Sequence, residues 1–401
     1  MQKSSNTSHI EFITLMASLM SLVALSIDAL LPALSPIGTS IHVTDNQDLQ
    51  LLITMIFLGL GVGQLISGPI SDSVGRKPLI YVGFIVFVLA SILCVYSESL
   101  EWMIVGRIFQ GVGLSAPRTL SIAMVRDTFS GNYMAKIMSF VVVIFILVPV
   151  VAPSIGKLLL DQYGWQAIFY SQLFFGAFVI LWLAKRQPET LKEEYKTPLR
   201  LQLFTNGLRE FFKQRQAWVF TLVSGLITGA FMVYLSASQQ IFENQYQLKE
   251  EFPFIFAGLA ISVGLATFLN GTLVMKYGMY RLVRFFAILF IAVSGAYIAL
   301  FYQTPNPSIY VLVTFFVLQF FAIGFLFGNL RSLAMQPIGH IAGVGAAYNG
   351  FISTIMAVPI ATFIGGFVKE TSLPLFIGFF CCGILALGLI LYGKTNDTNK
   401  N

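Results

Sequence analysis

Apolar residues fill long stretches of this chain with almost no charged residues inside them. A helix that crosses the roughly 30 Å hydrocarbon core of a bilayer needs about 20 such residues. Twelve stretches reach that length, at roughly 12–34, 49–70, 79–97, 102–124, 136–156, 165–184, 217–240, 253–275, 284–302, 309–333, 342–366 and 374–393. The pattern predicts an all-α membrane protein with twelve transmembrane helices.

Most of the polar segments between these stretches are short. The exception is the segment 185–216, which separates the first six stretches from the last six. We therefore expect an N-terminal six-helix bundle over residues 1–184 and a C-terminal bundle with a short tail over residues 217–401. Pseudo-symmetric halves of this kind build a transport site in a central cavity between them.

The linker between the halves has its own pattern. One helical face carries the apolar residues Leu201, Phe204, Leu208, Phe211 and Phe212. The opposite face carries the polar residues Gln202, Arg209, Lys213 and Gln214. This pattern predicts an amphipathic helix lying on the inner membrane surface, and a solvated linker is the alternative.

The composition agrees with a membrane protein. The chain is 56% hydrophobic and only 10% charged, whereas soluble domains are roughly 25% charged. These values exclude a secreted, cytosolic or DNA-binding protein. The net charge of +6 therefore does not indicate a nucleic-acid partner.

Lysine and arginine instead predict the orientation. If the N-terminus is cytoplasmic, eighteen of them lie on the cytoplasmic side, including the terminal Lys3, Lys394 and Lys400. Only Lys157, Lys249 and Lys369 lie on the outside. Positive residues favour the cytoplasmic side, so we expect both termini in the cytoplasm.

Cysteine and histidine give no sign of a metal or disulfide site. Cys94, Cys381 and Cys382 all lie in apolar stretches, and two are adjacent. The sequence also contains no nucleotide-binding loop and no pairing of a nucleophile with a base. We expect no enzymatic activity, no metal and no cofactor other than a coupling proton.

Two loops suggest an internal repeat. The loop after the second stretch contains Gly68 and Gly75, and the loop after the eighth contains Gly271 and Gly278. In both loops the glycines are seven residues apart and basic residues follow. The loops occupy the same place in their halves, which favours duplication of a six-helix unit.

The first of these loops resembles the signature loop of the major facilitator superfamily, with Gly68, Asp72, Gly75, Arg76 and Lys77 at the matching positions. Glycine permits close packing and reversal of the chain. Asp72 can hold an arginine, and the Arg126–Asp127 pair after the fourth stretch offers complementary charges. Such a cluster can lock one conformation and release it in another.

The fourth and fifth stretches resemble motifs of drug/proton antiporters in that superfamily. The fourth stretch carries Arg107, Gln110 and Gly111, and the fifth carries Pro149, Pro153 and Gly156. In the fifth, Lys157 stands where the motif has a second glycine, so this match is degenerate. The prolines indicate a kinked helix.

The first stretch contains Asp28 followed by Leu31-Pro32-Ala33. This resembles the bicyclomycin-resistance (Bcr/CflA) subfamily of drug exporters. The resemblance implies a multi-pass protein of the bacterial inner membrane that exports drugs, and it extends over nearly the whole chain.

Asp28 is the only carboxylate that we place deep inside a stretch, because Glu11, Glu98, Glu101 and Glu243 lie at stretch ends. Asp28 and Arg107 both fall about 10–15 Å below the outer surface, at 1.5 Å per helical residue, so we expect them to meet. Burial favours the neutral acid, and a neighbouring arginine favours the carboxylate. Asp28 is therefore the predicted carrier of the coupling proton, and a purely structural ion pair is the alternative.

Other residues are candidates for the cavity lining: Arg118, Phe231, Tyr234, Ser236 and Gln239. Arg118 and Arg331 occupy similar places in their halves, and each could bind an anion or extend to the membrane surface.

Together these features predict a monomeric, proton-coupled exporter of small amphiphilic compounds that works by alternating access in the lipid bilayer. A proton-coupled nutrient or metabolite transporter of the same fold is the first alternative. A membrane sensor is the second, although the sequence shows no soluble output domain. An intramembrane enzyme would need a catalytic constellation that we do not find.

Overall fold

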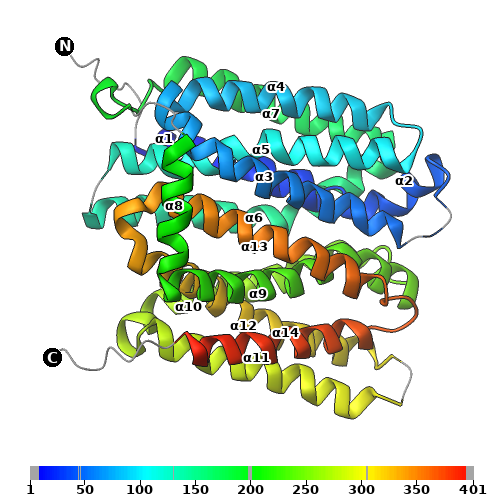
Figure 1. Ribbon diagram of the computed structural model, residues 1–401. Helices are drawn as coiled ribbons and strands as arrows, with labels where there is room; N and C mark the ends of the chain where they lie inside the picture. Colours follow the sequence, from blue (N-terminus) through cyan, green and yellow to red (C-terminus); the bar gives the residue numbers. More distant parts are fainter. Residues whose placement is uncertain are drawn as a thin grey trace. The chain divides into compact units, whose positions relative to one another are not determined.

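The computed structural model of the chain describes residues 9–43, 45, 47–129, 131–196, 201–303 and 306–393 (Figure 1). Lys3, Lys394 and Lys400, on which the predicted orientation partly rests, lie outside the described residues, as do the side chains of Leu201 and Phe204. All regular elements of the described part are helical, in agreement with the predicted fold class.

The chain forms two compact units, Met1–Arg200 and Leu201–Asn401. Unit 1 contains α1 (His9–Asp28), η1 (Leu31–Ala33), α2 (Leu34–Ser40), η2 (Asp48–Gln50), α3 (Leu51–Val74), α4 (Arg76–Val95), α5 (Leu100–Thr128), α6 (Gly131–Tyr163), α7 (Gln166–Arg186) and η3 (Glu193–Tyr195). Unit 2 contains α8 (Leu201–Lys213), α9 (Arg215–Gln239), η4 (Gln240–Gln245), α10 (Phe252–Tyr277), α11 (Met279–Phe301), α12 (Ile309–Met335), η5 (Gln336–Ile341), α13 (Ala342–Gly365) and α14 (Leu373–Tyr392).

Twelve of the described helical segments are long enough to span a membrane. Ten of them are also sufficiently apolar by composition. The other two are α5 and α6, of 29 and 33 residues. The predicted set of twelve long helices is therefore confirmed.

The two units repeat the same set of helix neighbours. In unit 1, α5 packs against α1, α3 and α4, and α7 packs against α1 and α4. In unit 2, α12 packs against α9, α10 and α11, and α14 packs against α9 and α11. The pairing of α1 with α6 matches that of α9 with α13. Helices α1 and α9 are therefore counterparts, as are α5 and α12.

The glycines of the repeated loops have two different roles. Gly75 (φ +106°) and Gly278 (φ +78°) have the positive φ values that permit a direct turn from one long helix into the next. Among the residues that the structure describes, Gly68 and Gly271 have no neighbouring atom within 4 Å of where a Cβ would lie. The prediction of close packing at Gly68 is therefore wrong.

Close packing of α3 on α5 occurs one to three turns earlier along α3. A Cβ on Gly59 would lie 1.9 Å from the carbonyl oxygen of Ile108, and one on Gly111 would lie 2.0 Å from that of Ile56. The two helix backbones touch here, as small residues in membrane helices permit.

The predicted amphipathic helix forms as α8, which crosses α9 and α13 (Figure 1). Phe211 is fully buried and its ring lies 6.0 Å from that of Tyr348 on α13. Phe212 stays 53% exposed. Part of the apolar face of α8 is thus packed within unit 2, whereas Leu208 and Phe212 stay exposed.

Candidate functional site

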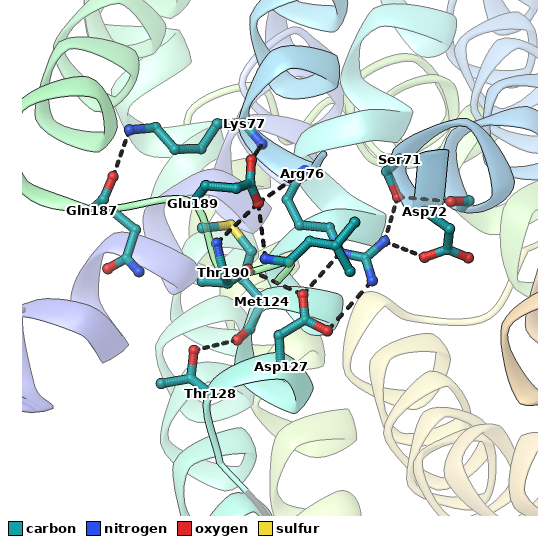
Figure 2. Close-up of polar contacts among 12 residues, drawn as sticks. Ser71, Asp72, Arg76, Lys77, Met124, Asp127, Thr128, Gln187, Glu189 and Thr190 are labelled. Atoms are coloured by element: carbon teal, nitrogen blue, oxygen red, sulfur yellow. Dashed lines mark hydrogen bonds and ion pairs between the residues drawn. The ribbon is translucent and has the colours of Figure 1, made fainter. Parts of the chain in front are cut away.

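A cluster of charged residues surrounds the turn from α3 into α4, and Arg76 is at its centre (Figure 2). Its Nη1 donates to Asp72 Oδ1 at 2.5 Å and to Ser71 Oγ at 2.6 Å. Its Nε donates to Asp127 Oδ2 at 2.9 Å. Arg76 thereby joins the end of α3 to the end of α5 with charge-assisted hydrogen bonds.

The cluster is partly sheltered. The side chain of Arg76 is 6% exposed, that of Asp127 17% and that of Asp72 38%. Exposed ion pairs contribute little to stability, whereas removing one partner of a sheltered pair is costly because it leaves an unpaired charge. We call Ser71, Asp72, Arg76 and Asp127 the Arg76 cluster.

Glu189, in the segment after α7, holds the first turn of α4. Its carboxylate accepts hydrogen bonds from the backbone amides of Arg76 (3.1 Å) and Lys77 (3.0 Å) (Figure 2). These amides have no partner inside the helix, and a carboxylate there also interacts favourably with the helix dipole. Thr190 Oγ1, from the same segment, donates to Asp127 at 3.1 Å.

A surface cavity of about 720 Å³ opens beside this cluster. Its lining comprises Asp72, Arg76, Arg126, Asp127, Thr128, Phe129, Thr190, Leu191, Lys192 and Tyr195. Arg126 lines the cavity with an exposed side chain. The cluster is therefore reachable by water from this side.

A second polar region lies where the first membrane segment is interrupted. Helix α1 ends at Asp28, and the chain continues through η1 into α2. Pro32 has no backbone N–H to continue the α-helical pattern. Asp28 is 5% exposed. Among the residues that the structure describes, none forms a hydrogen bond or ion pair with its carboxyl group.

Arg107 on α5 is fully buried next to this interruption. It donates to the carbonyl oxygens of Leu52 (2.7 Å) and Ser26 (3.0 Å) and to Gln110 Oε1 (2.8 Å). The expected contact between Arg107 and Asp28 is not formed. The carbonyls in the last turn of a helix have no intrahelical partner, and Arg107 binds the one at Ser26 instead.

Two of the predicted motif glycines support this region by permitting close backbone contact. Gly156 of α6 lies against the turn after α1, where a Cβ would be 1.9 Å from the carbonyl oxygen of Ala29. Gly111 lies against α3 in the same way. Helix α6 continues through Pro149 and Pro153 without a break in its helical assignment.

The predicted lining residues of unit 2 lie in a different environment. Tyr234 is 2% exposed and its ring packs against Phe316 and Phe320, at 5.2 and 4.5 Å between centroids. Phe231 contacts the same cluster, 5.5 Å from Phe320. Tyr234 is therefore part of the packed aromatic interior of unit 2, whereas Phe231 is half-buried. Their assignment as cavity lining stays a prediction.

The remaining candidates are more dispersed. Ser236 and Gln239 are both buried, and the side chain of Gln239 donates to Glu243 at 2.8 Å. Arg118 is half-buried, whereas Arg331 is exposed on α12.

The sequence analysis missed the contacts of Glu189 and the burial of Glu243. Glu189 follows Pro188 directly after the sixth stretch, and an acid at that place could have suggested a partner for the basic loop. Glu243 lies at the end of its helical segment, as expected, but it is only 9% exposed. It belongs to a π-helical turn, η4, and the sequence gives no direct signal of its burial.

Comparison with known proteins identifies relatives of the same length. An uncharacterized transporter, YdgK of Bacillus subtilis, is 28% identical over 389 residues, covering 96% of this chain and 95% of the relative. The Bicyclomycin resistance protein homolog of Haemophilus influenzae is 26% identical over 97% of both chains. Multidrug resistance protein MdtL of Vibrio parahaemolyticus is 26% identical over 93% of both.

Solved structures share the fold. A D-xylose-proton symporter superposes with a TM-score of 0.72 at 14% identity, covering 98% of this chain and all of the other. The human organic anion transporter TETRAN gives 0.67 at 16% identity, covering 97% and 99%. At these identities the likeness concerns the fold alone. The profile described as Major Facilitator Superfamily matches residues 16–361, and the chain is a multi-pass membrane transporter that belongs to this superfamily.

Proposed function

We propose that the protein exports small amphiphilic compounds across a bacterial inner membrane in exchange for protons. The names of its relatives support this reading, since they include a bicyclomycin resistance homolog and multidrug resistance proteins. Proton coupling and the direction of transport are our inference from the residues of this chain.

The observation that carries the proposal is the environment of Asp28. An ionised carboxylate in a membrane segment is costly unless it is paired. Asp28 is 5% exposed and ends α1, where the helix dipole also disfavours a negative charge. These conditions favour the protonated acid. Water that reaches Asp28 in another conformation would favour release of the proton.

Arg107 supplies the opposing influence. Its guanidinium is bound to the carbonyl of Ser26, two residues before Asp28. Movement of α1 relative to α5 would change the distance from this cation to Asp28. The balance between protonated and ionised Asp28 would then depend on the position of α1. Coupling by alternating access requires such a link between protonation and conformation.

The Arg76 cluster would act as the conformational lock on the cytoplasmic side of unit 1. Its ion pairs join the ends of α3 and α5, and Glu189 and Thr190 attach the segment after α7 to them. Breaking these contacts would free the helix ends to separate.

The test uses proteoliposomes with an imposed inward proton gradient and a fluorescent amphiphilic substrate. We expect Asp28→Asn to lose uphill export and to keep substrate binding, because asparagine has the shape of the protonated acid but releases no proton. Glu98→Gln, which changes an exposed acid, is the matched control and should behave as wild type. Undiminished proton-driven export by Asp28→Asn would contradict the proposal.

Two further measurements define the transport. A drug-susceptibility panel in a host without its own pumps should show resistance for an exporter and none for an importer. Exchange of one proton for a neutral substrate moves one charge inward, so export should also respond to voltage, at about 2.3 kcal/mol per charge per 100 mV.

A further inference from the structure

The guanidinium of Arg107 belongs to a chain of hydrogen bonds that continues onto α4. Arg107 Nη1 donates to Gln110 Oε1 at 2.8 Å, and Gln110 Nε2 donates to Ser91 Oγ at 2.8 Å. Ser91 Oγ in turn donates to the carbonyl oxygen of Phe87 at 2.7 Å. The side chains of all three donors are fully buried, so these bonds are shielded from competition by water.

The hydroxyl group of Ser91 determines how the amide of Gln110 is oriented. A hydroxyl has one hydrogen, and Ser91 donates it to Phe87. The Ser91 oxygen can therefore only accept from Gln110, so the amide must present its NH2 group to Ser91. The amide oxygen then faces Arg107, which can only donate. Without Ser91 this constraint is lost, and the turned amide would place its NH2 group against the guanidinium.

The orientation of Gln110 affects the whole guanidinium, because that group is planar and rigid. In the described part of the chain, Gln110 is the only hydrogen-bond acceptor for Arg107 Nη1. The other two nitrogen atoms donate to the carbonyl oxygens of Leu52 on α3 and Ser26 on α1. A fixed Nη1 therefore also fixes the direction of Nη2 towards Ser26, two residues before Asp28.

Helices α4 and α5 lie close enough here for a short side-chain connection. A Cβ on Gly113, one turn after Gln110, would lie 2.6 Å from the backbone nitrogen of Phe87. A Cβ on Gly83 would lie 2.6 Å from the carbonyl oxygen of Gly113. The two backbones touch, and the pair of Gln110 and Ser91 spans the contact beside them.

The counterpart serine of unit 2 is bonded differently. Ser294 is fully buried like Ser91 and donates to the carbonyl oxygen of Phe290, four residues earlier. Gln319 donates to this same carbonyl oxygen at 3.2 Å. Among the residues that the structure describes, no hydrogen bond joins Ser294 to Gln319. Both units therefore have the buried serine, and only in unit 1 does it orient the glutamine.

We propose that Ser91 is a positioning residue for proton-coupled transport. Through Gln110 it keeps the guanidinium of Arg107 directed at the end of α1, where Asp28 lies. Movement of α1 then changes the distance between Asp28 and a cation that is held in place from α4. This inference rests on the proposed function, because it names a residue that serves the same proton site.

The test compares two kinds of ethidium transport in proteoliposomes. Uphill export is driven by an imposed proton gradient, and exchange of ethidium is measured at equal pH on both sides. We expect Ser91→Ala to lower the ratio of uphill export to exchange about tenfold, the scale of one buried polar group left without its partner. Ser294→Ala, which removes the corresponding bond in unit 2, should leave this ratio unchanged.

A conservative variant separates hydroxyl orientation from packing. Ser91→Thr keeps the hydroxyl group and adds a methyl group, whereas Ser91→Ala only removes an oxygen atom. We expect the ratio for Ser91→Thr to lie closer to that of the wild type than the ratio for Ser91→Ala. The opposite order would indicate a packing effect and overturn the inference. An unchanged ratio in Ser91→Ala, or equal changes in Ser91→Ala and Ser294→Ala, would overturn it as well.

Melting temperatures of the purified variants test the connection without transport. The combination of Ser91→Ala with Arg107→Ala should lower the melting temperature by less than the sum of the two single losses, since both changes alter the bonding of Gln110. Additive losses would overturn the inference. If Ser91→Ala does not fold, Ser91→Cys replaces it in both measurements with the same expected direction, because a thiol is a weaker donor and acceptor than a hydroxyl.

Failure of the inference can be separated from failure of the proposed function. Non-additive melting temperatures, together with a wild type that shows no proton-driven export, would refute the proposed function and still support the positioning of Arg107 by Ser91. Proton-driven export that depends on Asp28 but is unaffected by Ser91→Ala would refute the inference only.

Discussion

Helices α5 and α12 are counterparts with the same scaffold and different chemistry at one position. Gln110 of α5 donates to Ser91 Oγ at 2.8 Å, and Gln319 of α12 donates to the carbonyl of Phe290 at 3.2 Å. Ser91 and Ser294 each donate to a carbonyl four residues earlier in α4 and α11. These matching bonds place the two glutamines in register.

Three residues before these glutamines the two helices differ. Arg107 of α5 joins α1 and α3 through hydrogen bonds to carbonyl oxygens. Phe316 of α12 packs against Tyr234, Phe320 and Phe376, at 5.2, 5.6 and 5.3 Å between ring centroids. At this position, hydrogen bonds from a buried guanidinium connect the helices of unit 1, whereas packed aromatic rings connect the helices of unit 2.

The turn from α3 into α4 and the corresponding turn from α10 into α11 also share a backbone geometry but differ in charge. Gly75 and Gly278 share a positive φ, but the places of Asp72 and Arg76 in unit 1 are taken by Met275 and Met279 in unit 2. The glycine is therefore required by the architecture. The charges are an addition to one unit only, which is why we assign them a role in the transport cycle.

The largest effect should come from removing Arg107. Arg107→Ala leaves two buried carbonyl oxygens and Gln110 without their donor, at about 1–3 kcal/mol for each unsatisfied group. We expect loss of transport and a lower melting temperature, measured in proteoliposomes and by thermal shift at matched membrane insertion. Arg331→Ala is the control, because Arg331 is exposed. Equal losses of transport and of melting temperature in both variants would mean that burial of the Arg107 guanidinium does not explain the effect.

Removing the ring at the corresponding position sharpens the comparison. Phe316→Ala creates a cavity in the aromatic interior, and large-to-small core changes of this kind cost about 3–5 kcal/mol. We expect a lower melting temperature of the purified protein, with proton-driven export per folded molecule better preserved than in Arg107→Ala. Export lost to the same degree as in Arg107→Ala would indicate that both positions serve the proton pathway.

A smaller effect should follow from a methyl group between α3 and α5. In unit 2 the place of Gly111 is taken by Phe320, and Ser262 donates across the α10–α12 contact to Val317 at 2.9 Å. Because Gly111 touches the backbone of α3, we expect Gly111→Ala to lower stability by about 1–3 kcal/mol, as overpacking does. Gly68→Ala, where nothing lies within 4 Å, should leave the melting temperature unchanged. A larger decrease in melting temperature for Gly68→Ala than for Gly111→Ala would contradict the proposed role of the contact between α3 and α5.

Hydropathy predicted the helices and the repeat because a membrane allows few alternatives to a long apolar helix. The place of Arg107 in the first third of its helix also followed from counting residues. Its bonding partners could not be predicted, because they are backbone carbonyl oxygens that any residue supplies. Gly111 was singled out for a motif, but only the helix contact shows which neighbour it approaches. Glu243 was expected at a stretch end, where it lies, but nothing in the sequence indicated that it would be buried.

The smallest predicted effects concern the Arg76 cluster, whose Asp72 and Arg76 have Met275 and Met279 at the matching positions of unit 2. Asp127 accepts hydrogen bonds from Arg76 and Thr190 and is 17% exposed, whereas Asp72 accepts one from Arg76 and is 38% exposed. Partly exposed ion pairs contribute about 0.2–1 kcal/mol, so we expect Asp127→Asn to change the initial transport rate several-fold and Asp72→Asn to change it less.

Asp161→Asn is a control for that ranking, because Asp161 pairs with Lys157 within α6 and away from the cluster. A double variant that combines Arg76→Gln with Asp127→Asn should be no worse than Arg76→Gln alone, since both changes remove the same interaction. Additive losses, or a larger effect of Asp72→Asn than of Asp127→Asn, would show that the charges act separately. The contrast with the methionines of unit 2 would then reflect membrane orientation, which basic residues also determine, and not a lock between helix ends.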